Sequence, residues 1–420
     1  MLYSMISHPL MGVLLALSVA VVDAVPQGDI TTSTITATTT TGTATLRVSR
    51  STTSSTTANS LIVVTGDLTM STTSSTTSPS SLITLTATSE TPAATALPAP
   101  LACNNSPLLC DRQYNHIAYL GTHNSPFVRD YPQNAQVGAN QDVNTTESLS
   151  AGVRLLTAPV RFDKGNLYLC HGPCWLSKQG SLSHWLLTIK EWLDANPNEI
   201  VTLVLNNKDD VHVEFFDRDF RLVDMHTYSY IPPASSATGM AAWPTLRQLI
   251  ENDTRLVTFI QGPQSLSADY AYFLDLFQYV FQTPWENMVG EGFDCKLDRP
   301  STFLSAADAI SAKFLPMINH FTYNLVTDGV VVVNEMDVED INDPSTDGRN
   351  TQALGWHIRQ CQTQWANSRP VFVLVDFFNR GSAIVAVDRM NEVEGTIIGR
   401  TEPELAVEES GASALFVSAD

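Results

Sequence analysis

Two histidines are the residues whose type and setting in this sequence best suit proton transfer. His123 follows the apolar segment that ends in YLGT, and His171 follows the apolar segment LYLC, with a glycine near each of them. If both segments are parallel strands of one barrel, their carboxyl ends open onto the same face and the two imidazoles converge there. One imidazole can then accept a proton while the other donates one. A single histidine is more often a packed core residue, so the prediction of a site depends on the pair.

The elements that must position these histidines follow from hydrophobic patterning. Apolar runs of strand length alternate with longer amphipathic stretches, which is typical of a parallel α/β fold. The expected strands are His116 to Leu120, Val153 to Val160, Ile200 to Leu205, Leu256 to Ile260, Phe314 to Ile318, Val330 to Val333 and Val371 to Val375. The expected helices start at Ser181 or Ser183, span Trp243 to Ile250 and Gln352 to Trp365, and follow Gly381. We therefore expect a distorted TIM-type (β/α) barrel; a doubly wound open sheet is the alternative, although no glycine-rich nucleotide motif follows the first strand.

The barrel is expected to be a single domain after a disordered amino-terminal stalk. Residues 1–24 contain a short apolar run before Ala24 and indicate a signal peptide; a membrane anchor is the alternative, but the run is short for a spanning helix. Residues 25–100 are rich in Ser and Thr and indicate a low-complexity, O-glycosylated stalk. Residues 101–400 would form the barrel and residues 401–420 a tail. Asn-x-Ser/Thr triplets at Asn104, Asn144 and Asn252 agree with a secreted, extracellular glycoprotein, with cell-wall association as a further option.

Cysteine use and charge exclude some classes of function. Six cysteines in an oxidising compartment can all form disulfides, and sequence proximity favours Cys103 with Cys110 and Cys170 with Cys174, which leaves Cys295 for Cys361. Six cysteines allow fifteen pairings, and the two cysteines around His171 could instead hold a metal, although no second cluster with zinc spacing is present. The formal net charge is -20, so a nucleic-acid partner is not expected.

Beyond the histidines, a set of ordered motifs resembles a known family. HIAYLGTHNS, GVRLL, LYLCHG, DANPNEIVTLVL and RPVFVLVDFFNRG follow one another between residues 102 and 400. Together they resemble the phosphatidylinositol-specific phospholipase C X-domain superfamily, in its secreted fungal PLC-like phosphodiesterase branch. The resemblance implies a distorted TIM barrel in which His123 is the base, His171 is the acid and Asp376 orients His123. A helix cap or an ion pair with Arg380 is the alternative role for Asp376.

The chain also departs from this family. Bacterial members have an arginine in the context DIR on the second strand, where this chain has Thr157, Ala158 and Pro159. Arg161 is expected to substitute for that arginine, and Arg154 is a weaker candidate at the start of the strand. Asn124 matches a calcium-ligand position of eukaryotic members and Asn206 ends the third strand, but such amides do not replace acidic ligands of a divalent cation. We therefore expect a site without a metal or another cofactor.

Several other polar residues are candidates for substrate contact. Asn206 and Lys208 lie in a turn expected at the barrel mouth, and Asn124 and Arg154 complete this set; loop solvation and helix capping are the alternative role of the turn. The expected function is a secreted phosphoric diester hydrolase in lipid metabolism, a monomer that cleaves a (glyco)phosphatidylinositol-like phosphodiester or another phospholipid at a membrane surface. A weakened or inactive barrel that binds lipid or glycan at the cell surface is the alternative. A glycosidase is disfavoured because no carboxylate pair ends the strands.

Overall fold

The computed structural model describes residues 33–40, 43–50, 82–86, 101–129, 138–233, 239–327 and 330–403, in two units that divide after Pro98. The first unit contains an antiparallel sheet in the order β2-β1-β3, formed by β1 (Ser33–Thr40), β2 (Thr43–Arg50) and β3 (Leu82–Thr86). These three strands fall within the Ser/Thr-rich segment, whose O-glycosylation stays a prediction. The predicted signal peptide and the tail beyond Glu402 and Pro403 lie outside the described residues.

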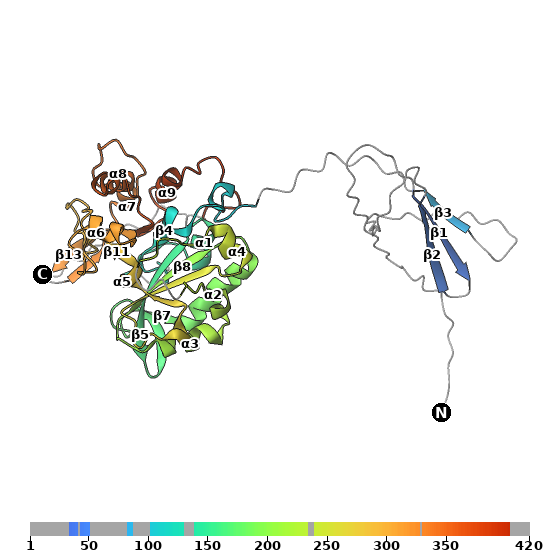
Figure 1. The fold of residues 1–420 in the computed structure, drawn as a ribbon, viewed down its shortest axis with the longest axis horizontal. Helices are drawn as coiled ribbons and strands as arrows, with labels where there is room; N and C mark the ends of the chain where they lie inside the picture. Colours follow the sequence, from blue (N-terminus) through green and yellow to red (C-terminus); the bar gives the residue numbers. More distant parts are fainter. Residues whose placement is uncertain are drawn as a thin grey trace, which may run out of the picture. The chain divides into compact units, whose positions relative to one another are not determined.

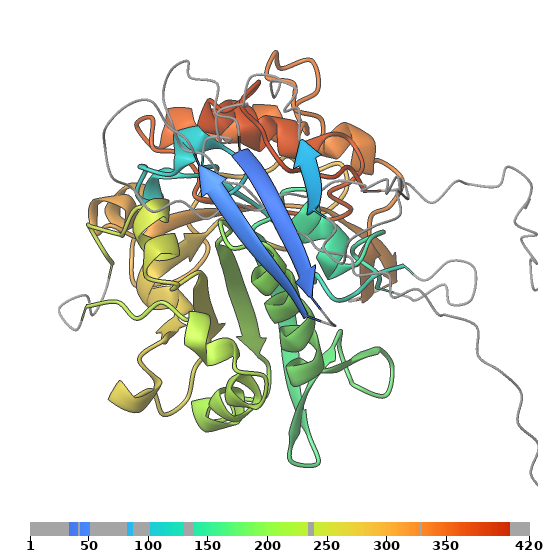
Figure 2. The same cartoon turned by 90° about the vertical axis from the view of Figure 1, so that its right-hand side faces the viewer.

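The second unit is built around one curled, parallel sheet with helices on its outer side (Figures 1 and 2). Its strands follow the order β10-β9-β8-β5-β4-β15-β12-β11, which is open between β10 and β11. The strands are β4 (Tyr119–Thr122), β5 (Leu155–Asp163), β8 (Val201–Asn207), β9 (Leu256–Gln261), β10 (Phe273–Asp275), β11 (Val280–Gln282), β12 (Leu315–His320) and β15 (Phe372–Val375). The predicted distorted barrel is confirmed, as a half-barrel.

Two strands are present as predicted, but their expected place in the parallel sheet is wrong. The segment that precedes His171 is β6 (Asn166–Cys170), which pairs antiparallel with β5 and, on its other edge, with β7 (Lys178–Ser181); it is not a parallel barrel strand. β14 (Val330–Val333) pairs only with β13 (Tyr323–Thr327), in an antiparallel hairpin outside the main sheet. In both cases the chain folds directly back on the preceding strand, which a short apolar run does not reveal.

The helices begin and end close to the predicted positions. Ser181 caps α2 through a hydrogen bond that its side chain accepts from the His184 backbone, and α2 buries Trp185, Leu186 and Ile189. Trp243 precedes its helix and stacks on Tyr114 at 4.9 Å. The helices are α1 (Thr145–Ser150), α2 (Leu182–Ala195), α3 (Val213–Leu222), α4 (Leu246–Glu251), α5 (Leu276–Tyr279), α6 (Ala306–Ser311), α7 (Val338–Ile341), α8 (Leu354–Gln364) and α9 (Ala383–Asn391). None of the helices in the described part of the chain is long and apolar enough to cross a membrane.

Alternation along each strand divides the core into two layers. In β8, Leu203 and Leu205 belong to one buried cluster, which also contains the buried faces of α2 and α3, whereas Val204 belongs to the other. In β4, Gly121 lies against the neighbouring strand β5, and a Cβ atom there would lie 2.6 Å from the Leu155 side chain. Every second residue of a strand points inward. When this alternation is continued to the carboxyl end of each strand, it predicts which side chains line the site there.

The chain enters and leaves the second unit at the opposite, amino-terminal end of the strands. There the Asn104 side chain accepts a hydrogen bond from the backbone of Ile200, just before β8. Asn105 receives the Arg154 guanidinium at 2.7 Å and the backbone N–H of Ile398 at 2.8 Å. Beginning and end of this unit are therefore tied together beside the starts of β5 and β8.

The three predicted disulfides are confirmed. Cys103 pairs with Cys110, Cys170 with Cys174, and Cys295 with Cys361. The glycosylation triplets differ in their exposure. Asn144 and Asn252 are exposed, but Asn104 is buried, which makes it a poor acceptor in the folded protein.

Candidate active site

A cavity of about 140 Å³ lies at the carboxyl ends of the parallel strands. Much of its lining obeys the inward alternation described above: His123 lies two residues after Gly121, Asn206 two after Val204, and Asn319 two after Met317. The apolar interior therefore gives way to polar side chains where the strands end. The lining residues are His123, Asn124, Thr157, Pro159, His171, Val204, Asn206, Lys208, Gln261, Gln282, Trp285, Arg299, Met317, Asn319, Phe321, Tyr323 and Leu374.

His123 is oriented by the neighbouring strand. β4 and β15 are paired so that Thr122 lies opposite Val375, and His123 and Asp376 follow them directly. The His123 Nδ1–H donates to Asp376 Oδ1 at 3.0 Å. The imidazole also stacks on Phe321 with ring centroids 4.0 Å apart. These contacts fix one tautomer, in which Nε2 of His123 carries the lone pair.

Asn140 extends this arrangement. Its Nδ2 donates to Asp376 Oδ1 at 2.9 Å, and its Oδ1 accepts from Asn124 Nδ2 at 3.1 Å. Gln141 donates to the His123 backbone carbonyl at 2.9 Å. Both Asn140 and Gln141 are fully buried. No motif in the sequence marks this pair, and the fold shows that Asn140 holds Asp376 and that Gln141 holds the backbone of His123.

His171 reaches the same cavity by another route. It follows β6, the antiparallel hairpin strand that leaves the end of β5, and its Nδ1–H donates to the Gly138 carbonyl at 2.8 Å. Gly138 has φ +95°, and a Cβ atom there would lie 2.8 Å from His171 Nδ1. Burial lowers the pKa of His171, the Gly138 carbonyl opposes this shift, and the nearby His123 adds to it. The pair therefore converges as expected, although the geometric reason given for it was wrong.

The other predicted site residues divide into two groups. Asn124, Asn206 and Lys208 line the cavity. Arg161 does not: its Nη1 donates to Asp209 at 2.6 Å, outside the cavity lining. Arg154 lies before β5, at the other end of the sheet, where it is buried and bonded to Glu199. The structure thus leaves both candidate arginines away from the histidines.

Arg299 is the cavity cation that the sequence did not indicate. It lies in the loop after β11, and its Nη2 donates to Gln282 Oε1 at 3.1 Å. Asn319 donates to the same oxygen at 3.2 Å. Gln282 and Asn319 could have been found by extending the alternation of β11 and β12 by two residues, but no pattern marks a residue in a long loop. None of the described residues that line the cavity is an aspartate or a glutamate, so this described lining carries positive charge in a strongly acidic protein.

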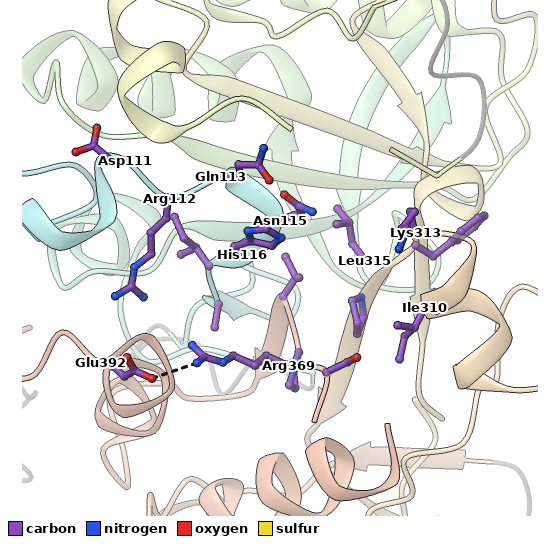
Figure 3. A pocket seen from close by; sticks show the side chains of 17 residues that line it. Asp111, Arg112, Gln113, Asn115, His116, Ile310, Lys313, Leu315, Arg369 and Glu392 are labelled. Atoms are coloured by element: carbon purple, nitrogen blue, oxygen red, sulfur yellow. Dashed lines mark hydrogen bonds and ion pairs between the residues drawn. The ribbon is translucent and has the colours of Figure 1, made fainter. Parts of the chain in front are cut away.

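A second cavity, of about 720 Å³, lies at the opposite end of the strands (Figure 3). It is lined by Ala118, Leu315 and Val371, which lie at or just before the starts of β4, β12 and β15. Its two arginines have structural partners, because Arg112 donates to the Asn391 carbonyl and Arg369 to the Met390 carbonyl at the end of α9. We therefore place the chemistry in the smaller cavity, where the two histidines converge.

One further cluster has the composition of a metal site. Cys295, His357 and Cys361 lie within 4.8 Å of one another and are buried. The two sulfur atoms are joined in a disulfide, which removes the thiolates that a metal would need.

Comparison with known proteins shows the family to which this chain is similar. Residues 109–391 match the family described as PI-PLC X 1. A protein of Arthroderma benhamiae named "PI-PLC X domain-containing protein 1" is 34% identical over 297 residues, which cover 69% of this chain and 90% of that protein. An "Uncharacterized secreted protein" of the same fungus is 31% identical over 311 residues, covering 71% of this chain and 66% of that protein.

Among solved structures, the phosphatidylinositol-specific phospholipase C of Listeria monocytogenes is 17% identical with a TM-score of 0.45, covering 69% of this chain and 97% of that one. That of Staphylococcus aureus is 16% identical with a TM-score of 0.38, covering 69% and 98%. The family match spans most of the second unit and coincides with both histidines and Asp376. This chain belongs to the PI-PLC X domain family.

Proposed function

We propose that the protein is a secreted phosphoric diester hydrolase of phospholipase C type that acts on a (glyco)phosphatidylinositol-like phosphodiester. One observation carries this proposal. Two imidazoles line one cavity, and each commits its Nδ1–H to a fixed acceptor, Asp376 for His123 and the Gly138 carbonyl for His171. Both Nε2 atoms are thereby left for the substrate, which suits a base and an acid acting on one phosphodiester.

The proposed reaction combines two proton transfers with bond formation and bond cleavage at phosphorus. Nε2 of His123 takes the proton of a hydroxyl next to the phosphate, and that oxygen forms a bond to phosphorus. The bond from phosphorus to the leaving oxygen breaks, and protonated His171 gives that oxygen its proton from Nε2. The products are a cyclic phosphodiester and an alcohol. Asp376 stabilises the imidazolium that forms on His123 and keeps its own charge.

The donor set of the cavity supports chemistry without a divalent metal. Hard cations such as calcium and magnesium take carboxylate oxygens, and no described residue of the cavity lining supplies one. Lys208 and Arg299 bring positive charge instead. The proposed enzyme therefore needs no cofactor, and its activity should persist in excess chelator.

The surface beside His171 suits a lipid substrate. Trp175 and Leu176 follow the loop that the disulfide Cys170–Cys174 closes, and they are 84% and 58% exposed. Exposed tryptophan and leucine side chains favour the interfacial region of a bilayer. A monomer that meets its substrate at a membrane surface is consistent with this arrangement. The alternative of an inactive lipid-binding barrel draws on the same surface and on the proline at position 159, where bacterial members have arginine.

Turnover by the full chain tests the proposal. In the presence of EDTA, the wild type should cleave phosphatidylinositol in vesicles, and His171→Ala should be slower by about 100-fold, because it lacks the acid that protonates the leaving oxygen. With a p-nitrophenyl phosphodiester of inositol, which keeps the hydroxyl next to the phosphate and whose leaving group needs no proton, the same variant should lose far less. The exposed His184→Ala serves as control and should behave like wild type. Failure of the well-folded wild type to cleave any of these diesters would favour the binding barrel.

The pH profile of kcat/KM is a separate prediction. His171 must be protonated at Nε2 to act as the acid, and burial lowers its pKa below the ordinary 6.5. The protonated form is therefore lost as the pH rises through a value below 6.5, and kcat/KM should then fall about tenfold per pH unit. Because kcat/KM reports the titration of the free enzyme, its measurement across the acidic and neutral range checks this prediction. A rate that stays constant up to about pH 8 would contradict the assignment.

A further inference from the structure

We propose that Arg299 and Lys208 form the phosphate-binding half of this site and hold the non-bridging oxygens of the phosphodiester between them. This inference rests on the proposed function, because it names the groups that would carry the phosphate in that reaction. It assigns the role to a residue in the loop after β11 and to one at the end of β8, neither of which is on the second strand.

Arg299 is held in place by its neighbours with part of its guanidinium uncommitted. The loop pairs with the end of β11, where the Gln282 backbone N–H donates to the Arg299 carbonyl at 2.8 Å. Nη2 donates to Gln282 Oε1, and Nε lies 3.3 Å from the Asp298 carboxylate. Among the described residues, Nη1 has no hydrogen-bond acceptor. A fixed arginine with a free N–H edge on a cavity is suited to a phosphate oxygen.

Lys208 supplies a second cation. It follows β8, and its ammonium group has no hydrogen-bond or ion-pair partner in the described part of the chain. Lys208 is an exposed residue at the cavity, where partial desolvation lowers its pKa and the charges of Arg299 and Arg161 lower it further. Like charges that face each other without an intervening anion repel, and an anion bound between them removes that repulsion. Arg299 has one carboxylate beside it, Asp298, but none of the described residues that line the cavity is acidic, so these two cations suit an anion bound in the cavity.

Arg161 is already engaged elsewhere. Its Nη1 donates to Asp209 Oδ1 at 2.6 Å, while Asp209 Oδ2 accepts the Phe162 backbone N–H at 2.8 Å. The carboxylate is therefore fixed by two bonds, and the arginine would have to leave it to reach the cavity. Arg161 is a suitable control, because it is also a cation near Lys208 but does not line the cavity.

Arg299 and Lys208 together, called the phosphate clamp below, would stabilise negative charge on the phosphate and would take no part in proton transfer. When the attacking oxygen bonds to phosphorus and the leaving oxygen has not yet departed, negative charge accumulates on the non-bridging oxygens. Fixed donors aimed at such oxygens typically contribute a factor of about 10²–10³ to the rate. Because both protons move through the histidines, loss of the phosphate clamp should lower kcat/KM without changing the pH at which the acid titrates.

The experiment compares three full-chain variants with wild type: Arg299→Gln, Arg299→Lys and the control Arg161→Gln. Cleavage of phosphatidylinositol vesicles is measured across pH, and binding of inorganic phosphate is measured by calorimetry. Arg299→Gln should lower kcat/KM about 10²–10³-fold with an unchanged pH profile, Arg299→Lys should regain at least tenfold, and Arg161→Gln should stay within about threefold of wild type. Phosphate should bind Arg299→Gln at least tenfold more weakly than wild type.

The outcomes separate this inference from the proposed function. If the wild type binds phosphate through Arg299 but cleaves no diester, the phosphate clamp stands and the proposed function is wrong. If the wild type cleaves the lipid, but kcat/KM falls in Arg161→Gln and not in Arg299→Gln, the proposed function stands and the phosphate clamp is wrong. Absence of saturable phosphate binding by wild type, or failure of Arg299→Lys to regain any activity in a folded protein, also overturns the phosphate clamp.

Discussion

Replacement of His123 by alanine is expected to reduce kcat/KM by about 10³- to 10⁴-fold, because the attacking hydroxyl then has no base. Asp376→Asn should cause a loss of similar size although the imidazole remains. The Asp376 carboxylate accepts the Nδ1–H and balances the charge of the imidazolium, whereas a neutral amide does neither reliably. Initial rates on phosphatidylinositol vesicles give both values.

A double variant distinguishes this coupling from two independent effects. In the proposed mechanism Asp376 acts through His123, so Asp376→Asn should add little to His123→Ala, and the two losses should be far from additive. Asp209→Asn is the matched control, because Asp209 lies at the same end of the barrel and pairs with Arg161 outside the cavity. Fully additive losses in the double variant would show that Asp376 does not work through this imidazole.

The second large effect concerns stability below neutral pH. His320 and His357 are buried side by side with their Nδ1 atoms 2.9 Å apart, and His320 Nε2 donates to the Ile341 carbonyl at 2.9 Å. Since His320 Nε2 carries a proton, its Nδ1 must accept the Nδ1–H of His357. Phe293 packs against both rings. A second proton on either ring would place a charge in this core and disrupt the bond between the rings.

Burial accordingly lowers the pKa of both histidines: that of His320 falls well below its ordinary value, and that of His357 falls to about 3, although the Asp294 carbonyl opposes the latter shift. In the unfolded chain both rings titrate near 6.5. Above that pH the pair does not affect stability; below it the unfolded state gains protons that the folded state excludes. Each ring should then cost about 1.4 kcal/mol of stability per pH unit, until the pH approaches the folded pKa.

Chemical denaturation at a series of pH values measures this slope. In His357→Gln one of the two titrating groups is absent, and its amide can still donate to His320. The variant should therefore lose stability less steeply than wild type between about pH 6 and pH 4, by about 1.4 kcal/mol per unit. The exposed His184→Gln should keep the wild-type slope. Identical slopes for His357→Gln and wild type would mean that other groups determine the acid sensitivity.

The strand pattern made much of this site predictable. β4 and β15 are short, apolar and adjacent, so the residues that follow them, His123 and Asp376, must meet once the parallel sheet forms. α2 was predictable for the same local reason, since Ser181 and its apolar stripe lie within a few turns. Local pattern and fold agree at these positions.

Other parts of the site depend on contacts that no local pattern encodes. β6 has the composition of a barrel strand, and only its pairing with β5 shows that His171 arrives on a hairpin. Arg161 continues the inward register of β5, yet it lies where β5 has left the barrel sheet to pair with β6. Arg299 is placed by its bridge to Gln282, across a loop too long for sequence to predict. The proposed chemistry therefore predicts a cation near the histidines, but the sequence does not show which residue supplies it.

The joined beginning and end of the second unit give the molecule a polarity. Because Asn105 and Ile398 meet beside the starts of the strands, the described beginning and end of this unit lie at the end of the sheet opposite to the two histidines. A support attached close to residue 101 or to residue 403 should therefore leave the cavity around His123 and His171 accessible.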